Sequence, residues 1–356
     1  MVALAKDGVD LSALIRSAAP FCRRAELAYP RKGVGRKPEI PDWVIAVLIV
    51  AAVLKQRKSK SSQYRFLWAH HEWLLKLLGV DRFPSRTTYF DRYRRAWKLL
   101  ETAIRLAGEE AIENRWISAR CVAVDKSIVP ARGPRWNKRQ VARGRIPHGA
   151  DLEATWTYNH HQGWMLGYSY EVVVTAEKAG AVWPLIASAG PASVQPLRTF
   201  PAKVPHLPEE TRYVLADAGY DGNALAESIE YAACGRRTGR RMLCPQYDRS
   251  GMRRRTKTAH KRSRDRVHHQ SLREQRQCFF EGDFAQRLMK RRGMKIEPYN
   301  DWLKSRFDLH HQVWHRGLDN NKTHLLAATF CYQLLLIENH RQGHSNGCIQ
   351  WILDRL

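Results

Sequence analysis

Three acidic residues stand where a folded chain could bring their side chains together. Asp125 ends the apolar run 121–124, and Asp217 ends the apolar run 213–216. Glu297 lies much later, in a segment with helical character. An Asp at the end of a buried strand is rigidly placed, so two such strands side by side can present two carboxylates to one ligand. A Glu from a helix over the sheet edge can complete the group.

Three carboxylates of this kind suit the cleavage or transfer of a phosphodiester. That reaction needs a nucleophile in line with the leaving group and charge relief on both oxygens, which two Mg²⁺ ions roughly 3.5–4 Å apart provide. Mg²⁺ prefers hard oxygen ligands and keeps several waters, so a few carboxylates are enough. The three residues therefore predict a site for two Mg²⁺ ions, with Mn²⁺ as a substitute.

Each acid also has a simpler interpretation. An Asp at the end of a strand is commonly a turn former or a helix N-cap, and Asp125 alone favours that view. Asp217 is the stronger candidate, because Gly219 permits a tight exit from the strand. Asp221 is a rival ligand, and we expect it to cap the helix that follows. Glu297 could be an exposed helix residue, and spacing alone does not choose between it and four other acids: Glu274, Glu281, Asp283 and Asp301.

The charge of the chain points to a polyanionic partner. Its 356 residues contain 60 Lys and Arg against 34 Asp and Glu, a formal net charge of +26. Such a field attracts phosphate backbones and gives salt-sensitive binding. Ribosomal-type and membrane-surface proteins share this charge, but size and apolar content disfavour the first, and no lipid anchor supports the second. We expect double-stranded DNA as the partner and no membrane.

Cysteine usage and hydropathy predict a cytoplasmic protein. The seven cysteines are scattered singly without a CxxC pair, so we expect reduced thiols and no zinc ribbon. The longest apolar run, residues 43–54, is shorter than the roughly 20 residues that cross a bilayer. It reads as a buried helix.

The chain divides into a helical part and a part with strands. Residues 1–115 predict an all-helical domain, and residues 116–345 predict a second domain with a mixed sheet covered by helices on both faces, an α/β (α+β) fold. Helices are also expected over 223–232, from 268 onward and over 321–338. The expected strands are 122–125, 167–175, 182–188, 213–216 and 241–244, the second pairing with the third.

Residues 61–100 resemble a helix-turn-helix DNA reader. A helix from Ser61 and another ending at Gly79 precede Ser85, a good N-cap. The next helix interleaves arginines with aromatic residues, as DNA-contacting helices do. The alternative is an amphipathic helix whose arginines only face water. The arginines concerned are Arg86, Arg92, Arg94 and Arg95.

A strongly basic stretch covers residues 236–266. We expect a loop or arm that lies on DNA. The residues expected to touch DNA there are Arg253, Arg254, Arg255 and Lys261.

The assembled segments resemble transposases of bacterial insertion sequences, of the DDE class. The resemblance rests on Val124-Asp125-Lys126-Ser127, the strand at Gly167, the Asp217-Ala-Gly-Tyr-Asp221 segment, and Glu297 with Lys304. Six residues separate Glu297 from Lys304, as in the signature of one large group of these enzymes. The signature's arginine position holds Gly293, so either the helix register differs or Arg292 reaches the same phosphate.

The resemblance implies an RNase H-like core in which Asp125, Asp217 and Glu297 bind two Mg²⁺ ions. It also makes Lys304 a contact to phosphates near the cut end and the basic stretch a modest insertion. Pro298 suggests that Glu297 lies at a helix start or a kink. Arg316 is expected to touch DNA or cap a helix.

The activity implied is that of a DNA transposase. It would bind terminal inverted repeats, cleave the element's ends and transfer them to target DNA, as a homodimer on DNA in the bacterial cytoplasm at the nucleoid. Two alternatives remain open. One is a nuclease or resolvase of the same fold that does not join ends, and the other is a DNA-binding protein that has lost catalysis.

Overall fold

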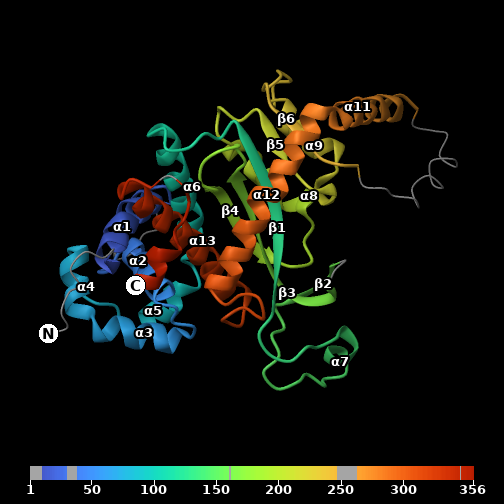
Figure 1. Ribbon diagram of the computed structural model, residues 1–356. Coiled ribbons are helices and arrows are strands. Elements are labelled where there is room, and N and C mark those ends of the chain that lie inside the picture. The colour runs from blue at the N-terminus through green and yellow to red at the C-terminus, as the bar shows by residue number, and fades with distance from the viewer. Residues whose placement is uncertain (1–9, 30–37, 160–161, 247–262, 345) are drawn as a thin grey trace.

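Helices form the N-terminal part of the chain and lead into a sheet-containing part (Figure 1). The computed structural model describes residues 10–29, 38–159, 162–246, 263–344 and 346–356. The first six helices are α1 (Leu11–Leu27), α2 (Asp42–Leu54), α3 (Lys60–Ala69), α4 (His71–Leu78), α5 (Arg86–Tyr93) and α6 (Trp97–Glu113).

Local sequence signals explain where these helices begin and end. The Ser59 hydroxyl accepts from the Ser62 amide at 3.0 Å, and the Ser85 hydroxyl accepts from the Thr88 amide at 3.2 Å. Gly79 ends α4 in the left-handed conformation, with φ of 64°. These are the N-cap and C-cap arrangements that polar side chains and glycine favour. α2 is buried all round from Trp43 onward, as its uniform hydrophobicity predicts.

Six strands form one mixed sheet within the described residues. The strand order is β2-β3-β1-β5-β6, and β4 pairs with residues 168–174 of β3. β1 pairs antiparallel with β3 and parallel with β5, and β5 pairs parallel with β6. The strands are β1 (Cys121–Pro130), β2 (Thr155–Asn159), β3 (Gly163–Thr175), β4 (Pro184–Pro191), β5 (Tyr213–Leu215) and β6 (Arg241–Leu243).

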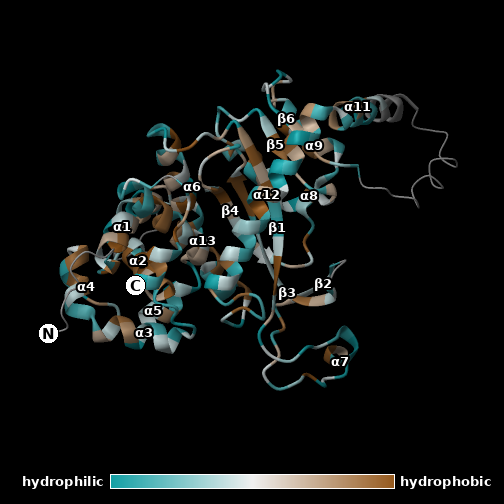
Figure 2. Cartoon of the chain, viewed as in Figure 1, coloured by the Kyte–Doolittle hydropathy of each residue, from teal (hydrophilic) through white to brown (hydrophobic). Residues whose placement is uncertain are grey.

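Helices cover this sheet and join it to the N-terminal part. α13 packs against α1, α2 and α6 as well as against β3 and β4, so the two parts share one hydrophobic core. The strands carry much of the hydrophobic colour in Figure 2. The remaining elements are α7 (Lys138–Ala142), α8 (Pro196–Thr199), η1 (Pro201–His206), η2 (Ala218–Tyr220), α9 (Asn223–Glu230), α11 (Ser263–Glu281), α12 (Asp283–Arg306), α13 (Leu318–Arg341) and α14 (Gln350–Arg355).

The two faces of β1 and β3 meet different elements, because successive side chains of a strand point to opposite faces. Asp125 points to the face on which α12 lies. Lys126 and its cross-strand partner Glu171 point to the other face, where η1 brings Lys203 against Glu171. Adjacent residues of the same strands therefore serve the two opposite faces of the sheet.

The sequence predictions for the elements are largely confirmed. The five expected strands correspond to β1, β3, β4, β5 and β6, and the third does pair with the second. β2 was not predicted, and β1 continues to Pro130, well beyond the expected end at 125. The proposed domain boundary near residue 115 falls between α6 and β1 and stays a prediction.

Of the two positions that Pro298 suggested for Glu297, the helix start is wrong, and the kink stays a prediction. α12 begins at Asp283 and continues through Pro298 to Arg306. Proline lacks the amide that would bond one turn back, yet the burial of Ile296, Tyr299 and Leu303 along one side holds the helix against the sheet and α13.

The described chain contains no helix that is both long enough and apolar enough to span a membrane.

A close approach between β1 and β3 yields a prediction about stability. A Cβ added at Gly167 would clash with the Val129 carbonyl oxygen and lie 3.1 Å from the Pro130 Cα. We expect Gly167→Ala to lower the free energy of unfolding by about 2–3 kcal/mol, because both neighbours are backbone atoms of a paired strand. Urea denaturation measures this.

Gly190 provides the matched control, because it lies in β4 of the same sheet and a Cβ there would meet nothing within 4 Å. We expect Gly190→Ala to change stability by less than about 1 kcal/mol in either direction. Equal effects of the two substitutions would contradict the close packing at Gly167.

Candidate active site

The register of two parallel strands brings Asp125 and Asp217 to the same edge of the sheet. Ala123 of β1 pairs with Leu215 of β5. Asp125 lies two residues after Ala123, and Asp217 lies two residues after Leu215. Parallel strands end on the same side, so the two side chains leave the sheet together. The sequence prediction that these strands lie side by side is confirmed.

One arginine of α12 lies between the two carboxylates. The guanidinium nitrogen Nη2 of Arg292 donates to Asp125 Oδ1 at 2.8 Å and lies 3.8 Å from Asp217 Oδ2. Two negative groups thus converge on one positive charge. The Nε atom of Arg292 is buried and has no partner among the described residues. Arg292 was expected to contact DNA, and in the free protein it pairs with the acids instead.

Asp125 is the more enclosed of the two acids. Its side chain is 20% exposed, against 49% for that of Asp217. Burial raises the pKa of the Asp125 carboxyl above its usual value, Arg292 opposes this rise, and the charge of Asp217 adds to it. Asn300 donates from Nδ2 to Asp125 Oδ2 at 2.8 Å and also favours the ionised form.

A tight turn fixes the backbone at Asp217. Asp217 is the N-cap residue of η2, and its Oδ1 accepts from the Gly219 amide at 2.9 Å. Its carbonyl oxygen accepts from the Tyr220 amide at 3.1 Å and from the Cys244 thiol at 2.9 Å. One oxygen of the Asp217 carboxylate is therefore used in the turn, and the other faces Arg292.

Glu297 occupies the face of α12 that also carries Asn300 and Lys304. Residues three, four and seven apart lie along one side of a helix, and Gly293, Glu297, Asn300 and Lys304 follow that spacing. Glu297 is exposed. A Cβ at Gly293 would lie 3.4 Å from Glu297 Oε1, so the glycine leaves space beside that carboxylate. Along the helix axis, Glu297 lies between Arg292 and Asn300, which both bond to Asp125.

No group of three or more His, Cys, Asp and Glu side chains within the described residues is close enough together to hold a metal ion. The structure therefore brings Asp125 and Asp217 together on Arg292, while Glu297 does not form one group with them among the described residues.

The donor set suits a hard cation between the two aspartates. Two carboxylates already face one charge, and carboxylate oxygens are the ligands that Mg²⁺ prefers. Glu297 has an exposed side chain on the same face of α12 as Asn300, the residue that donates to Asp125.

Lys304 also belongs to this site. It lies four residues after Asn300 on the same side of α12. Burial lowers the pKa of its ammonium group, and the charge of Asp125 opposes this change. Arg316 is exposed and lies elsewhere, against the segment of Gly133 and Gly149, where a Cβ at Gly149 would meet its Nη2 at 2.7 Å.

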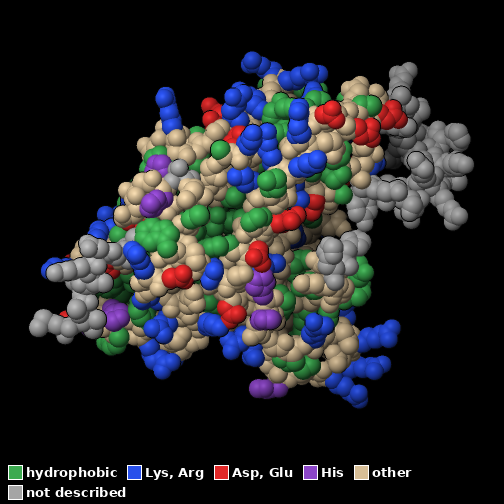
Figure 3. Space-filling view, viewed as in Figure 1, with side chains coloured by type: hydrophobic (Ala, Val, Ile, Leu, Met, Phe, Trp, Pro, Cys, Tyr) green, Lys and Arg blue, Asp and Glu red, His purple; other side chains and the backbone are tan. Residues whose placement is uncertain are grey.

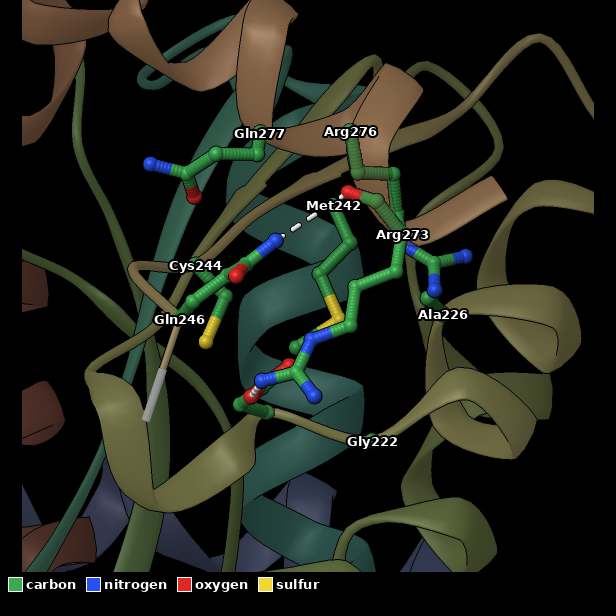
Figure 4. Close-up of a pocket in the computed structure, with 9 residues that line it drawn as sticks. Gly222, Ala226, Met242, Cys244, Gln246, Arg273, Arg276 and Gln277 are labelled. Atoms are coloured by element: carbon green, nitrogen blue, oxygen red, sulfur yellow. Dashed lines mark hydrogen bonds and ion pairs between the residues drawn. The ribbon is translucent and has the colours of Figure 1, made fainter. Parts of the chain in front are cut away.

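Asp221 does not cap α9. The N-cap position is Gly222, and the Asp221 carboxylate pairs with Arg273 of α11 at 2.8 Å. Arg273 and Cys244 line a cavity of about 20 Å³ behind the Asp217 turn, and Gln246 donates to the Arg273 carbonyl at 3.2 Å across it (Figure 4). A cavity of that size has room for little more than one water-sized molecule, so it is no nucleotide site.

The arginines of α5 differ in their surroundings. Arg86 is exposed, donates to the Ser61 hydroxyl at 3.2 Å and lies over the Phe90 ring at 5.3 Å. Arg92 is largely enclosed, pairing with Asp42 at 3.2 Å and donating to the Ile40 carbonyl. Arg94 and Arg95 follow the helix and are exposed.

Arg253, Arg254, Arg255 and Lys261 lie outside the described residues. Lys and Arg side chains gather in Figure 3 over the β6 end of the sheet and over the segment that contains α7.

Asn300 and Tyr170 are site residues that the sequence analysis missed. The Tyr170 hydroxyl donates to Asn300 Oδ1 at 2.8 Å, and Asn300 in turn holds Asp125. Asn300 lies three residues after Glu297, which is a helical spacing that could have indicated it. Tyr170 gave no such signal, because a tyrosine in an apolar strand looks like core.

Comparison with known families agrees with this geometry. The family model described as "Transposase DDE domain" matches residues 116–334, more than half of the chain. The chain therefore belongs to the transposase DDE domain family, and its resemblance to DDE-class insertion-sequence transposases is confirmed. The matched region contains all three candidate acids. No curated protein and no solved structure is similar enough to the chain to count as a match.

The ion pair between Arg292 and Asp125 can be measured by a double-mutant cycle. Arg292→Met should lower the free energy of unfolding by about 3 kcal/mol, because it leaves an enclosed carboxylate without its cation. With Asp125→Asn as the second variant, we expect a coupling energy of about 1–3 kcal/mol from urea denaturation.

The control cycle uses Arg105→Met and Glu109→Gln on α6, a more exposed pair at 2.5 Å one helical turn apart. Its coupling should stay below about 0.5 kcal/mol. A coupling at Arg292 no larger than this would show that the guanidinium does not neutralise Asp125.

Proposed function

We propose that this protein is a DNA transposase that binds the terminal inverted repeats of an insertion sequence, cleaves the DNA there and transfers the ends. The observation that carries the proposal is the convergence of Asp125 and Asp217 on one positive charge, within a region that matches the DDE family. Glu297, on the adjacent face of α12, is the third acid of the proposed site.

The residues of the chain divide the work between ligation and positioning. Asp125 and Asp217 would be the shared ligands of Mg²⁺, or of Mn²⁺ in its place, and Glu297 the third. Bound as a pair, these ions supply charge relief for the entering and leaving oxygens of a phosphodiester. Asn300 orients Asp125 through its amide, and Tyr170 orients Asn300.

Two cations near the acids are suited to DNA phosphates. Arg292 compensates the aspartates in the free protein, and an arriving metal charge would release its planar guanidinium to bind a phosphate. Lys304 lies on the same helix as Arg292, four residues after Asn300, and offers a second contact at the cut end. α12 would thereby connect metal binding with DNA binding.

The fold supports a division of labour along the chain. We infer an RNase H-like core in residues 116–345 and a DNA-reading domain in residues 1–115, with a helix-turn-helix-like part at 61–100. The short α3, α4 and α5 and the capped start of α5 support the latter. The net charge of +26 supports double-stranded DNA as the partner.

Paired cutting of two element ends leads us to propose a homodimer on DNA, acting in the bacterial cytoplasm at the nucleoid. A transposase differs from a nuclease of the same fold in its second step, the joining of a free 3′-hydroxyl to target DNA.

Loss of each acid should abolish DNA cleavage. We expect Asp125→Asn, Asp217→Asn and Glu297→Gln each to reduce the rate at least about 10³-fold, because charge stabilisation of the transition state is lost. The assay uses the DNA that flanks the gene, with Mg²⁺ and, separately, Ca²⁺, and cleavage should occur in Mg²⁺. Strand-transfer products from a pre-nicked end should be lost in the same variants.

Asp301→Asn is the matched control, because Asp301 is an acid of the same helix with a 75% exposed side chain. It should cleave at close to the wild-type rate. Hydrolysis without joining would favour a nuclease, and full activity of Asp125→Asn would overturn the proposal.

The surroundings of Arg86 and Arg92 predict different effects on DNA binding and stability. Arg86→Ala should weaken binding to an end fragment several-fold and reduce the slope of log affinity against log salt by about 1, because an exposed phosphate contact is lost. Arg92→Ala should instead lower the free energy of unfolding by about 1–2 kcal/mol, because its bond to the Ile40 carbonyl is lost.

Binding at several salt concentrations and urea denaturation together separate the two roles. The DNA-reading role of α5 would be contradicted if Arg86→Ala bound DNA with unchanged affinity and unchanged salt dependence.

A further inference from the structure

A buried polar network lies on the face of the sheet opposite Asp125. Glu171 of β3 is 3% exposed and pairs closely with Lys203 of η1, which is 5% exposed. Thr199 donates to Glu171 Oε1 at 3.0 Å, and Tyr220 donates to the same oxygen at 2.9 Å. A buried carboxylate is costly unless it is paired and hydrogen-bonded, and here three donors satisfy it.

Tyr220 connects this network to the Asp217 turn. It is the last residue of η2, whose N-cap is Asp217, and its amide donates to the Asp217 carbonyl at 3.1 Å. Its ring is fully buried, edge-on to Phe200 at 5.6 Å. The hydroxyl bond to Glu171 therefore ties the far end of a three-residue turn to the centre of the sheet. A turn this short has little freedom to move its first residue once its last residue is held.

The adjacent residue of β3 holds the other acid. Tyr170 points to the α12 face and bonds to Asn300, which bonds to Asp125. Glu171 points to the opposite face and bonds to Tyr220. One strand thus anchors both aspartates, each from its own face of the sheet.

We propose that Glu171 and Tyr220 are positioning residues that hold the Asp217 turn so that its carboxylate faces Asp125 at a distance suited to a shared divalent cation. This inference rests on the proposed metal-dependent function. Neither residue is proposed to touch metal or DNA. Partners behind a metal ligand commonly change metal affinity by about 10–100-fold when they are removed.

The test compares Tyr220→Phe with the wild type by two readouts. The ring and its packing remain, and only the bond to Glu171 is lost. In the metal-free protein, the peptide that covers residues 213–225 should exchange amide hydrogens faster, because the turn opens more often. Mn²⁺ binding, measured by electron paramagnetic resonance without DNA, should weaken about 10-fold.

Tyr168→Phe is the matched control. Tyr168 is a buried tyrosine of the same β3 strand, and its hydroxyl donates to the Asp151 carboxylate at 2.7 Å, in a segment away from Asp217. It should leave exchange in 213–225 and Mn²⁺ affinity unchanged. Thr199→Val removes a different donor to Glu171 and should lower thermal stability with Mn²⁺ affinity retained. If Tyr220→Phe does not fold, Glu171→Gln combined with Lys203→Met carries the test, because the amide holds the hydroxyl less strongly and no buried cation is left unpaired.

The outcomes distinguish the inference from the proposed function. Wild-type exchange and Mn²⁺ affinity in a folded Tyr220→Phe, while the wild type cleaves DNA in Mg²⁺, would overturn the positioning role alone. A wild type that neither binds Mn²⁺ nor cleaves DNA would overturn both. Faster exchange together with weaker Mn²⁺ binding in Tyr220→Phe but not in Tyr168→Phe would establish the role.

Discussion

The site depends on two carboxylates being held close together against their mutual repulsion. The parallel register of β1 and β5 puts Asp125 and Asp217 at one edge of the sheet, so the backbone fixes where both side chains begin. The pKa of Asp125 is raised by burial and by Asp217, so the pair is electrostatically unfavourable by itself. Arg292 compensates this in the free protein. The rest of the structure serves to keep the strands, the turn and α12 in these places.

β3 has the largest share in that task. It pairs with β1, β2 and β4, and its side chains supply apolar contacts along with the polar anchors Tyr170 and Glu171. Strand alternation explains how adjacent residues can serve opposite faces. A helix would have placed such neighbours only about 100° apart, so the two-sided support of the site follows from its being built on a sheet.

Much of the fold was predictable from the sequence, and the site only in part. Apolar runs and capping residues located the strands and helices, because burial and local hydrogen bonding act over a few residues. β2 was missed although Trp156 and Tyr158 alternate with polar residues over Thr155–Asn159, a pattern typical of a strand. The hydrogen-bond partners of the acids could not be predicted, for a physical reason. Asn300 lies 175 residues from Asp125 in the sequence, and only the packed fold brings them together. Pro298 wrongly suggested a helix start, because the tertiary packing of α12 outweighs one missing backbone hydrogen bond.

The position of Arg292 has a consequence for the order of events at the site. A guanidinium between two carboxylates and a divalent cation between the same carboxylates compete for one region of negative potential. The doubly charged ion would interact more strongly with both acids and displace Arg292. A displaced Arg292 would then need a phosphate as its partner, because a cation left enclosed and unpaired is costly. Under the proposed function, metal and DNA therefore bind cooperatively, because each removes a penalty that the other would meet alone. The proposed metal ions would then be held most firmly when the proposed DNA substrate is in place.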